Sequence, residues 1–293
     1  MFFRITATSF LLFMLVLQQA TACEQTAPSA RCVTTGEWQL NVAIGAGYRS
    51  NPLHGGRNWP LWLLPDASYY GERWFFDNGT VGYTLDPTSD LQVSLVSRLN
   101  EEAGYFRHGS PANIFQRQGI ANIDGPQEKF LFASELQINK LDKRPLALDG
   151  GLQLNWQGVG LQWQANWWHD MSNQYHGQHI RLGAAYSLEN RSGAWQLSAA
   201  LAWKDKDLMN TYYGISATEN DGQAWLVSAS WQPELALQWQ YPLNASWSVL
   251  SLLRYRWVDD QATTNTAPFK SQNPMMQEDR IRSWFVGLNY RFF

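Results

Sequence analysis

Apolar and polar side chains alternate with a period of two along most of the chain, and the C-terminal segment shows the pattern most clearly. There one row is apolar and the other is small or polar: Trp284, Val286, Leu288, Tyr290 and Phe292 against Gly287, Asn289 and Arg291. Because successive strand side chains point to opposite faces, this alternation predicts a strand with one face toward lipid and the other toward a lumen. Aromatic residues at the extreme C-terminus, here Tyr290, Phe292 and Phe293, are typical of bacterial outer-membrane proteins. We expect them to be the signal for the barrel-assembly machinery.

The same alternation recurs in many further segments. One segment alone would indicate little, because half-buried strands of soluble sandwiches also alternate, but the recurrence predicts an all-β protein. We predict an antiparallel, transmembrane, up-and-down β-barrel of about 12 strands with both termini in the periplasm. Segments 72–78 and 80–86 are shorter than the ~9 to 11 residues of a span, so a barrel of about 10 strands is the alternative. The predicted strands are 37–49, 60–70, 72–78, 80–86, 90–100, 145–157, 159–170, 178–189, 194–205, 223–242, 246–259 and 279–293.

Composition agrees with a membrane barrel that is exported from the cytoplasm. The 293 residues are 45% apolar and only 16% charged, with 16 Trp, whereas a typical soluble domain carries roughly 25% charged residues. The longest apolar run, Ser9 to Leu17, is too short for a transmembrane helix. With Arg4 before it and the small residues Ala20 to Ala22 after it, this run predicts a signal peptide. The predicted parts are a signal peptide (1–22), a periplasmic leader (23–36) and an outer-membrane barrel (37–293).

Cys23 and Cys32 are the only cysteines, and both lie in the predicted leader. An oxidising periplasm allows them to form a disulfide that closes a small loop. The alternative is lipidation of Cys23 as the first mature residue, although Ala20 stands where a lipidation motif usually has Leu. The net charge of −3 gives no support to nucleic-acid binding, which normally shows as a basic patch.

Connection lengths fit the predicted topology, since such barrels have short periplasmic turns and longer extracellular loops. The segment 101–144 is too long for a plain loop, and we expect Lys129 to Lys140 to extend a strand above the membrane or to form a lid. Short and long connections alternate: 87–89, 157–158, 190–193 and 244–245 against 50–59, 171–177, 206–222 and 260–278.

Four motifs resemble one known family. Ala43 to Gly56 resembles the GvGyrssPyrGG opening of the MipA/OmpV family, the MltA-interacting outer-membrane proteins, and Tyr69 to Phe76 resembles its Y-x-G-d-r-F-f block. Val81 to Leu85 and Tyr212 to Ser216 resemble its lGyrL and YYGVS segments. The chain departs from the family pattern in two loops, at Asn51 and Leu53 and at Asn273 to Met275.

The resemblance implies a barrel that acts as a scaffold between a lytic transglycosylase and a bifunctional peptidoglycan synthase. Other members of the family are associated with envelope stress, adhesion or permeability, so architecture is implied more firmly than function. We therefore expect a non-enzymatic scaffold in contact with outer-membrane lipid and lipopolysaccharide. A narrow anion-preferring channel or an adhesion protein is the alternative.

Among the residues predicted to face the lumen, the arginines give the clearest indication of a function. A ring of inward guanidinium groups near the extracellular mouth favours anions in a pore. The inward acids Asp149, Glu189 and Glu234 offer another outcome, in which they pair with the arginines and plug a small barrel. Arg280 and Arg282 have the opposite parity and are candidates for contact with lipopolysaccharide phosphates or for a solvated rim. The inward set is Arg49, Arg98, Arg181, Arg254 and Arg256.

Candidate catalytic chemistry is limited to His169, Asp170, His176 and His179 around one extracellular loop, the arrangement expected of a hydrolase at the barrel rim. His169 and Asp170 are adjacent on a predicted strand and therefore point to opposite faces. Phosphate loops, nucleophile elbows and paired-cysteine metal motifs are missing from the sequence. We predict no enzyme activity, no cofactor and no metal site.

Overall fold

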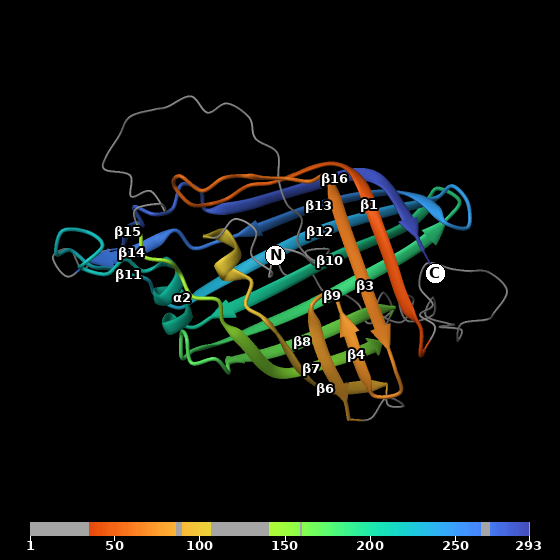
Figure 1. Ribbon diagram of the computed structural model, residues 1–293, viewed down its shortest axis with the longest axis horizontal. Coiled ribbons are helices and arrows are strands. Elements are labelled where there is room, and N and C mark those ends of the chain that lie inside the picture. Colours follow the sequence, from red (N-terminus) through yellow and green to blue (C-terminus); the bar gives the residue numbers. More distant parts are fainter. Residues whose placement is uncertain (1–34, 86–89, 107–140, 159, 265–269, 293) are drawn as a thin grey trace, which may run out of the picture.

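A computed structural model describes residues 35–85, 90–106, 141–158, 160–264 and 270–292. Nearly all of its regular structure is strand (Figure 1). The elements are β1 (Trp38–Arg49), β2 (Trp59–Pro60), β3 (Leu63–Tyr70), β4 (Trp74–Asp77), β5 (Thr80–Thr84), β6 (Leu91–Leu99), η2 (Glu102–Tyr105), β7 (Leu148–Gly158), β8 (Leu161–Asp170), β9 (Gln178–Asn190), β10 (Gly193–Lys204), α2 (Lys206–Tyr213), β11 (Trp225–Leu226), β12 (Ser230–Pro242), β13 (Trp247–Trp257), β14 (Gln261–Thr264), β15 (Ser271–Gln272) and β16 (Arg280–Arg291).

The strands form a closed antiparallel barrel of 12 strands, which confirms the prediction of 12 rather than 10. Neighbours in the sheet are neighbours in the sequence, and β16 closes the barrel on β1 with Val42 opposite Tyr290. The short strands β4 and β5 do belong to the wall. Their hairpin turns at Asn78 and Gly79, which both have positive φ (47° and 91°), as the favoured two-residue hairpin turn requires.

One predicted strand is wrong in extent. Segment 223–242 is divided, because β11 leaves the barrel and pairs with β14 in a separate three-stranded sheet. The cause lies in α2, where the Asn210 side chain bonds both the N–H and the C=O of Val227 (2.8 Å each). These two bonds occupy the backbone groups that a continuous strand would use in the barrel, so the barrel strand β12 begins only at Ser230.

The outer surface is apolar, as the alternation predicts. On β7, Leu152, Leu154 and Trp156 are exposed, whereas the intervening Gln153 and Asn155 are partly buried. Aromatic pairs lie near the strand ends on both sides, for example Trp156 with Trp163 and Trp203 with Trp231. Such girdles are typical of barrels that cross a membrane.

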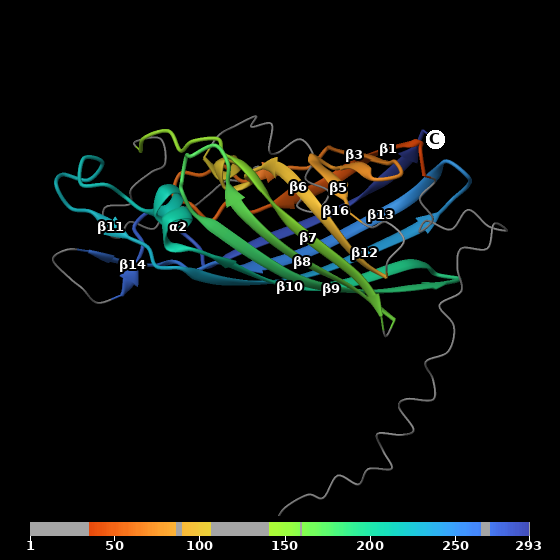
Figure 2. The same cartoon turned by 90° about the horizontal axis from the view of Figure 1, so that it is seen from below.

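The two ends of the barrel differ. At one end the described turns are short, and at the other lie α2, η2 and the small sheet of β11, β14 and β15 (Figures 1 and 2). Because short turns face the periplasm in such barrels, we call these the turn end and the extracellular end. Among the described residues no helix is long and apolar enough to cross a membrane.

A hydrophobic cap covers the extracellular end. Its buried residues come from α2 and from loops distant in sequence, among them Leu53, Tyr212 and Met275. Asp205 caps α2 by accepting a hydrogen bond from the Leu208 N–H (2.9 Å). Asn51 and Leu53, two departures from the family pattern, both lie buried here, and the Asn51 amide donates to the Tyr105 carbonyl (3.0 Å).

A second apolar cluster lies inside the barrel, where the sequence predicts small or polar side chains. It is built on inner positions of β1, β3, β13 and β16, and Phe285 is fully buried in it. Glycines make the room: a Cβ at Gly45 or Gly287 would lie 2.9 or 2.6 Å from the Phe285 ring. The expectation of a small or polar inner row therefore does not hold at these positions. The cluster comprises Ala43, Leu61, Leu64, Leu250, Leu252 and Phe285.

Candidate functional site

The interior beneath the cap holds a layer of ion pairs centred on Glu234. The carboxylate of this β12 residue is bonded by Arg181 of β9 (2.9 Å) and by Arg256 of β13 (2.7 Å). Arg254 lies farther away, with its Nε 3.8 Å from Glu234. Register brings the groups together, since Glu234 and Arg256 are direct partners across β12 and β13. Three of the five predicted lumen arginines thus share one carboxylate.

Two further acids, the N-cap residue Glu101 and the first residue Glu102 of η2, enter this layer directly after β6. Glu102 pairs with Lys204 of β10 (2.5 Å) and accepts a short hydrogen bond from the Tyr213 hydroxyl. Glu101 lies 3.8 Å from Arg256. None of these three charged residues was predicted: Glu101 and Glu102 fall in segment 101–144, for which no period-two pattern was found, and Lys204 lies near the end of predicted strand 194–205. The adjacent acids immediately after a strand were the available signal.

The other two predicted arginines have different partners. Arg49 donates a short hydrogen bond to the Tyr105 hydroxyl, and its guanidinium lies over the rings of Trp59 and Tyr105 (5.5 and 4.8 Å). Arg98 lies 3.2 Å from Nε2 of His179 and 4.5 Å from the ring of Trp168. Both therefore help to fill the interior.

The predicted inward acids behave differently from one another. Glu234 pairs with arginines, whereas Asp149 accepts hydrogen bonds from Asn100 (2.8 Å) and Tyr175 (2.7 Å). Glu189 is exposed near the turn after β9. The Arg98 Nε and His179 Nδ1 atoms are buried and have no hydrogen-bond partner in the described structure.

The four candidate catalytic residues do not converge. His169 stacks on the outward Trp167, whereas Asp170 points inward and accepts backbone hydrogen bonds from Ser172, Tyr175 and His176. Asp170 therefore shapes the loop, and no group of three possible metal ligands occurs among the described residues.

Arg280 and Arg282 lie exposed on the outer face, each paired with a nearby acid. Arg280 bonds Asp279 (2.5 Å) and the Tyr255 hydroxyl (3.1 Å), and Arg282 bonds Glu278 (2.6 Å). Tyr290 packs on Trp247 (4.8 Å) and Phe292 (4.9 Å). Residues 1–22, Cys23, Cys32, segment 129–140 and Phe293 lie outside the described residues.

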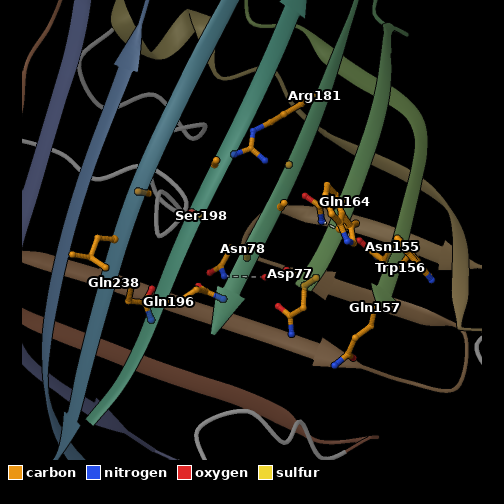
Figure 3. Close-up of a pocket in the computed structure, with 18 of the residues that line it drawn as sticks. Asp77, Asn78, Asn155, Trp156, Gln157, Gln164, Arg181, Gln196, Ser198 and Gln238 are labelled. Carbon is orange, nitrogen blue, oxygen red and sulfur yellow. Dashed lines mark hydrogen bonds between the residues drawn. The ribbon is translucent and has the colours of Figure 1, made fainter. Parts of the chain in front are cut away.

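Below the ion-paired layer the barrel contains a polar chamber of about 780 Å³ (Figure 3). Its walls come mainly from inner residues of β6 to β10 and β12, and it shares Arg181 with the layer above. Only about 20 Å³ is open within that layer, room for about one water molecule. The chamber residues include Asp77, Asp90, Gln92, Asn155, Gln157, Gln162, Gln164, Gln196, Ser198, Gln238 and Arg254.

Exposure along β8 shows which way the chamber opens. Gln162 beside the turn is exposed, Gln164 is partly buried, and Asn166 and Asp170 are buried. The same gradient holds on β12, from partly buried Gln238 to buried Glu234. The chamber is thus open at the turn end and closed toward the extracellular end.

These features define an outer-membrane β-barrel whose described interior is blocked below the extracellular cap. The chain belongs to the family described as MltA-interacting protein MipA, whose model matches residues 42–292. No curated protein matches the chain.

Among solved structures the chain is similar to the trimer form of Vibrio cholerae OmpT, at 7% identity and TM-score 0.36. The match covers 88% of this chain and 100% of that chain. An outer membrane channel from Pseudomonas putida F1 is similar at 10% identity and TM-score 0.36, covering 92% of this chain and 100% of that one.

Proposed function

We propose that this protein is a non-enzymatic scaffold that holds peptidoglycan-remodelling enzymes at the periplasmic surface of the outer membrane. The family name refers to interaction with MltA, and we propose a lytic transglycosylase and a bifunctional peptidoglycan synthase as partners. The observation that carries the proposal is the blocked interior, in which Glu234 and Glu102 neutralise inward cations beneath the cap. A barrel filled in this way supports anchoring more than transport.

In-cell photo-crosslinking tests the scaffold at its two ends. A photo-reactive amino acid in place of Asn190, at the end of β9, or of Asn244, in the turn before β13, should capture a lytic transglycosylase or a peptidoglycan synthase. The same replacement at Asn173, in the loop after β8, is the matched control and should capture neither. If neither enzyme is captured from the turns, and neither co-purifies with the full-length barrel after crosslinking in cells, the scaffold proposal is wrong.

The predicted leader is the larger periplasmic element, and a disulfide from Cys23 to Cys32 would lower the entropy that it loses on binding. Deleting Thr26 to Thr34 should leave barrel assembly intact but weaken co-purification of the enzymes. Unchanged co-purification would restrict the binding surface to the turns.

A narrow anion-preferring channel is the second candidate, because cations outnumber carboxylates in the described interior layer. If the barrel conducts, Arg254→Glu together with Arg256→Glu should reverse its ion preference. The scaffold proposal expects no conductance from the parent barrel in planar bilayers, since the layer leaves only about 20 Å³ open. The layer comprises Arg49, Arg98, Arg181, Lys204, Arg254 and Arg256 with Glu101, Glu102, Asp149 and Glu234.

Arg280 and Arg282 are proposed contacts for lipopolysaccharide phosphates, since both guanidinium groups are exposed near the extracellular end. Exchanging an acid partner for a phosphate keeps the charge-assisted hydrogen bonds. Arg280→Gln with Arg282→Gln should weaken lipopolysaccharide co-purification, and unchanged co-purification would contradict the assignment.

A further inference from the structure

Most of the polar side chains that line the chamber are amides, and several of these amides have hydrogen-bonding capacity to spare. Gln157, Gln162 and Gln238 make no side-chain hydrogen bond with any described residue. Figure 3 shows Gln157, Gln196 and Gln238 around one cavity, with Arg181 at the end away from Gln157. Each amide offers two donors and an acceptor, which matches the mixed donors and acceptors of sugar hydroxyl and acetamido groups.

The closed end of the chamber is cationic. Arg254 makes no hydrogen bond with a described residue, and its Nε lies 3.8 Å from a Glu234 carboxylate that Arg181 and Arg256 already bond. Arg181 and Arg254 both line the chamber. Their side chains keep 27% and 18% of their exposure, more than the 11% of Arg256. Two guanidinium groups thus reach the chamber with donors that suit an anion.

We infer that the chamber binds an acidic, N-acetylated saccharide that enters from the periplasm, with its carboxylate held by Arg181 and Arg254. Hydroxyl and acetamido groups then bond the amides nearer the mouth. The inference rests on the proposed function for the source of this ligand, which is the carboxylate-bearing amino-sugar chain of the cell wall.

Size and charge distribution favour this ligand over a free anion. A volume of about 780 Å³ falls within the ~300 to 1,000 Å³ of small-molecule sites. Asp77 and Asp90 also line the chamber, so negative charge is disfavoured there away from the arginines. A largely neutral molecule with one carboxylate places its charge only at the arginines.

Calorimetric titration of the purified full-length barrel tests the inference with two disaccharides of similar size. The acidic probe joins N-acetylglucosamine to N-acetylmuramic acid, and the neutral probe joins two N-acetylglucosamine units. We expect the acidic probe to bind about tenfold more tightly, the scale of one charge-assisted hydrogen bond. Acetate alone should not compete at equal concentration. Absence of binding, or equal affinity for the two probes, would overturn the inference.

Two variants assign the contacts. Arg254→Gln should reduce the preference for the acidic probe over the neutral probe, since only Arg181 is left to hold the carboxylate, and undiminished preference would contradict the proposed carboxylate site. Ser198→Trp places a large side chain in the chamber and should abolish binding of both probes, so it tests the binding site if Arg254→Gln does not fold. Arg57→Gln, an exposed residue between β1 and β2, is the control. Crosslinking of the enzymes should persist in Ser198→Trp, which separates this inference from the scaffold proposal.

Discussion

Two walls of the same barrel carry opposite kinds of side chain on their inner faces, polar on one and apolar on the other. Where β7 to β10 border the chamber of about 780 Å³, their inner positions carry mostly Gln, Asn, Ser and small residues. Along β1, β13 and β16 the inner positions include Leu250, Leu252 and Phe285, which fill the interior. Both walls present the same apolar face to lipid. The outer row therefore specifies the membrane environment, and the inner row decides whether the lumen is open or packed.

The strongest test of this contrast is to place a carboxylate in the packed wall. Leu250→Asp should cost about 5 kcal/mol or more, because it loses a buried leucine and places an unpaired charge among apolar side chains. We expect the variant to fail to assemble, as seen by loss of heat-modifiable migration on electrophoresis. Ala236→Asp is the control, since this chamber residue is the register partner of Arg254. Equal assembly of both variants would contradict the division into two walls.

Truncating an inner side chain tests the same contrast with a smaller expected loss of stability. Phe285→Ala should cost about 3 to 5 kcal/mol, the usual range for a fully buried aromatic. Ser198→Ala in the chamber should change the unfolding free energy by less than about 0.5 kcal/mol. Urea unfolding of the barrel in lipid vesicles measures both changes. A small effect of Phe285→Ala would mean that the internal cluster contributes little to stability.

Sequence patterns predicted the outer faces, the closure and the number of strands, because lipid contact imposes a strict period of two. They did not predict the internal cluster, yet Val249 to Leu253 and Trp284 to Val286 are apolar on nearly every position. A strand that is apolar in both rows indicates burial on both faces, and this signal was available.

The ion-paired layer could be predicted from the sequence only in part. The inward parity of Arg181 and Arg254 follows from alternation, but their shared partner follows from the register of β9, β10, β12 and β13. Glu101 and Glu102 reach the layer through a chain reversal after β6, for which no periodic pattern exists. Contacts between distant segments therefore had to come from the three-dimensional structure.

The third prediction concerns the apolar outer face that both walls present to lipid. Leu201→Arg on the outer side of β10 should cost about 2 to 4 kcal/mol near the membrane midplane. Ser198→Arg on the inner side of the same strand meets the chamber and should be tolerated. Comparing the yield of folded barrel from both variants measures the difference. Equal tolerance would refute the assigned faces.

The smallest expected effect concerns the cap, which covers the packed and open walls alike. Burial alone would raise the pKa of the Glu219 carboxyl, but the Ser216 N–H and the Arg144 guanidinium (each 2.8 Å away) hold that pKa below its ordinary value of 4.5. The bonds therefore stabilise the cap above about pH 4.5 and are lost as pH falls through the lowered folded-state pKa.

We expect a local contribution of about 1 to 2 kcal/mol, since hydrogen bonds to charged groups in partly solvated sites have this strength. Hydrogen exchange at α2 should accelerate as pH drops below 4.5, after correction for the intrinsic exchange rate. In Glu219→Gln the same segment should exchange faster at pH 7 and should lose this pH dependence. Exchange in β8 and β10, which hold the chamber, should not change with the variant. If Glu219→Gln keeps the parental pH profile, another group controls the cap.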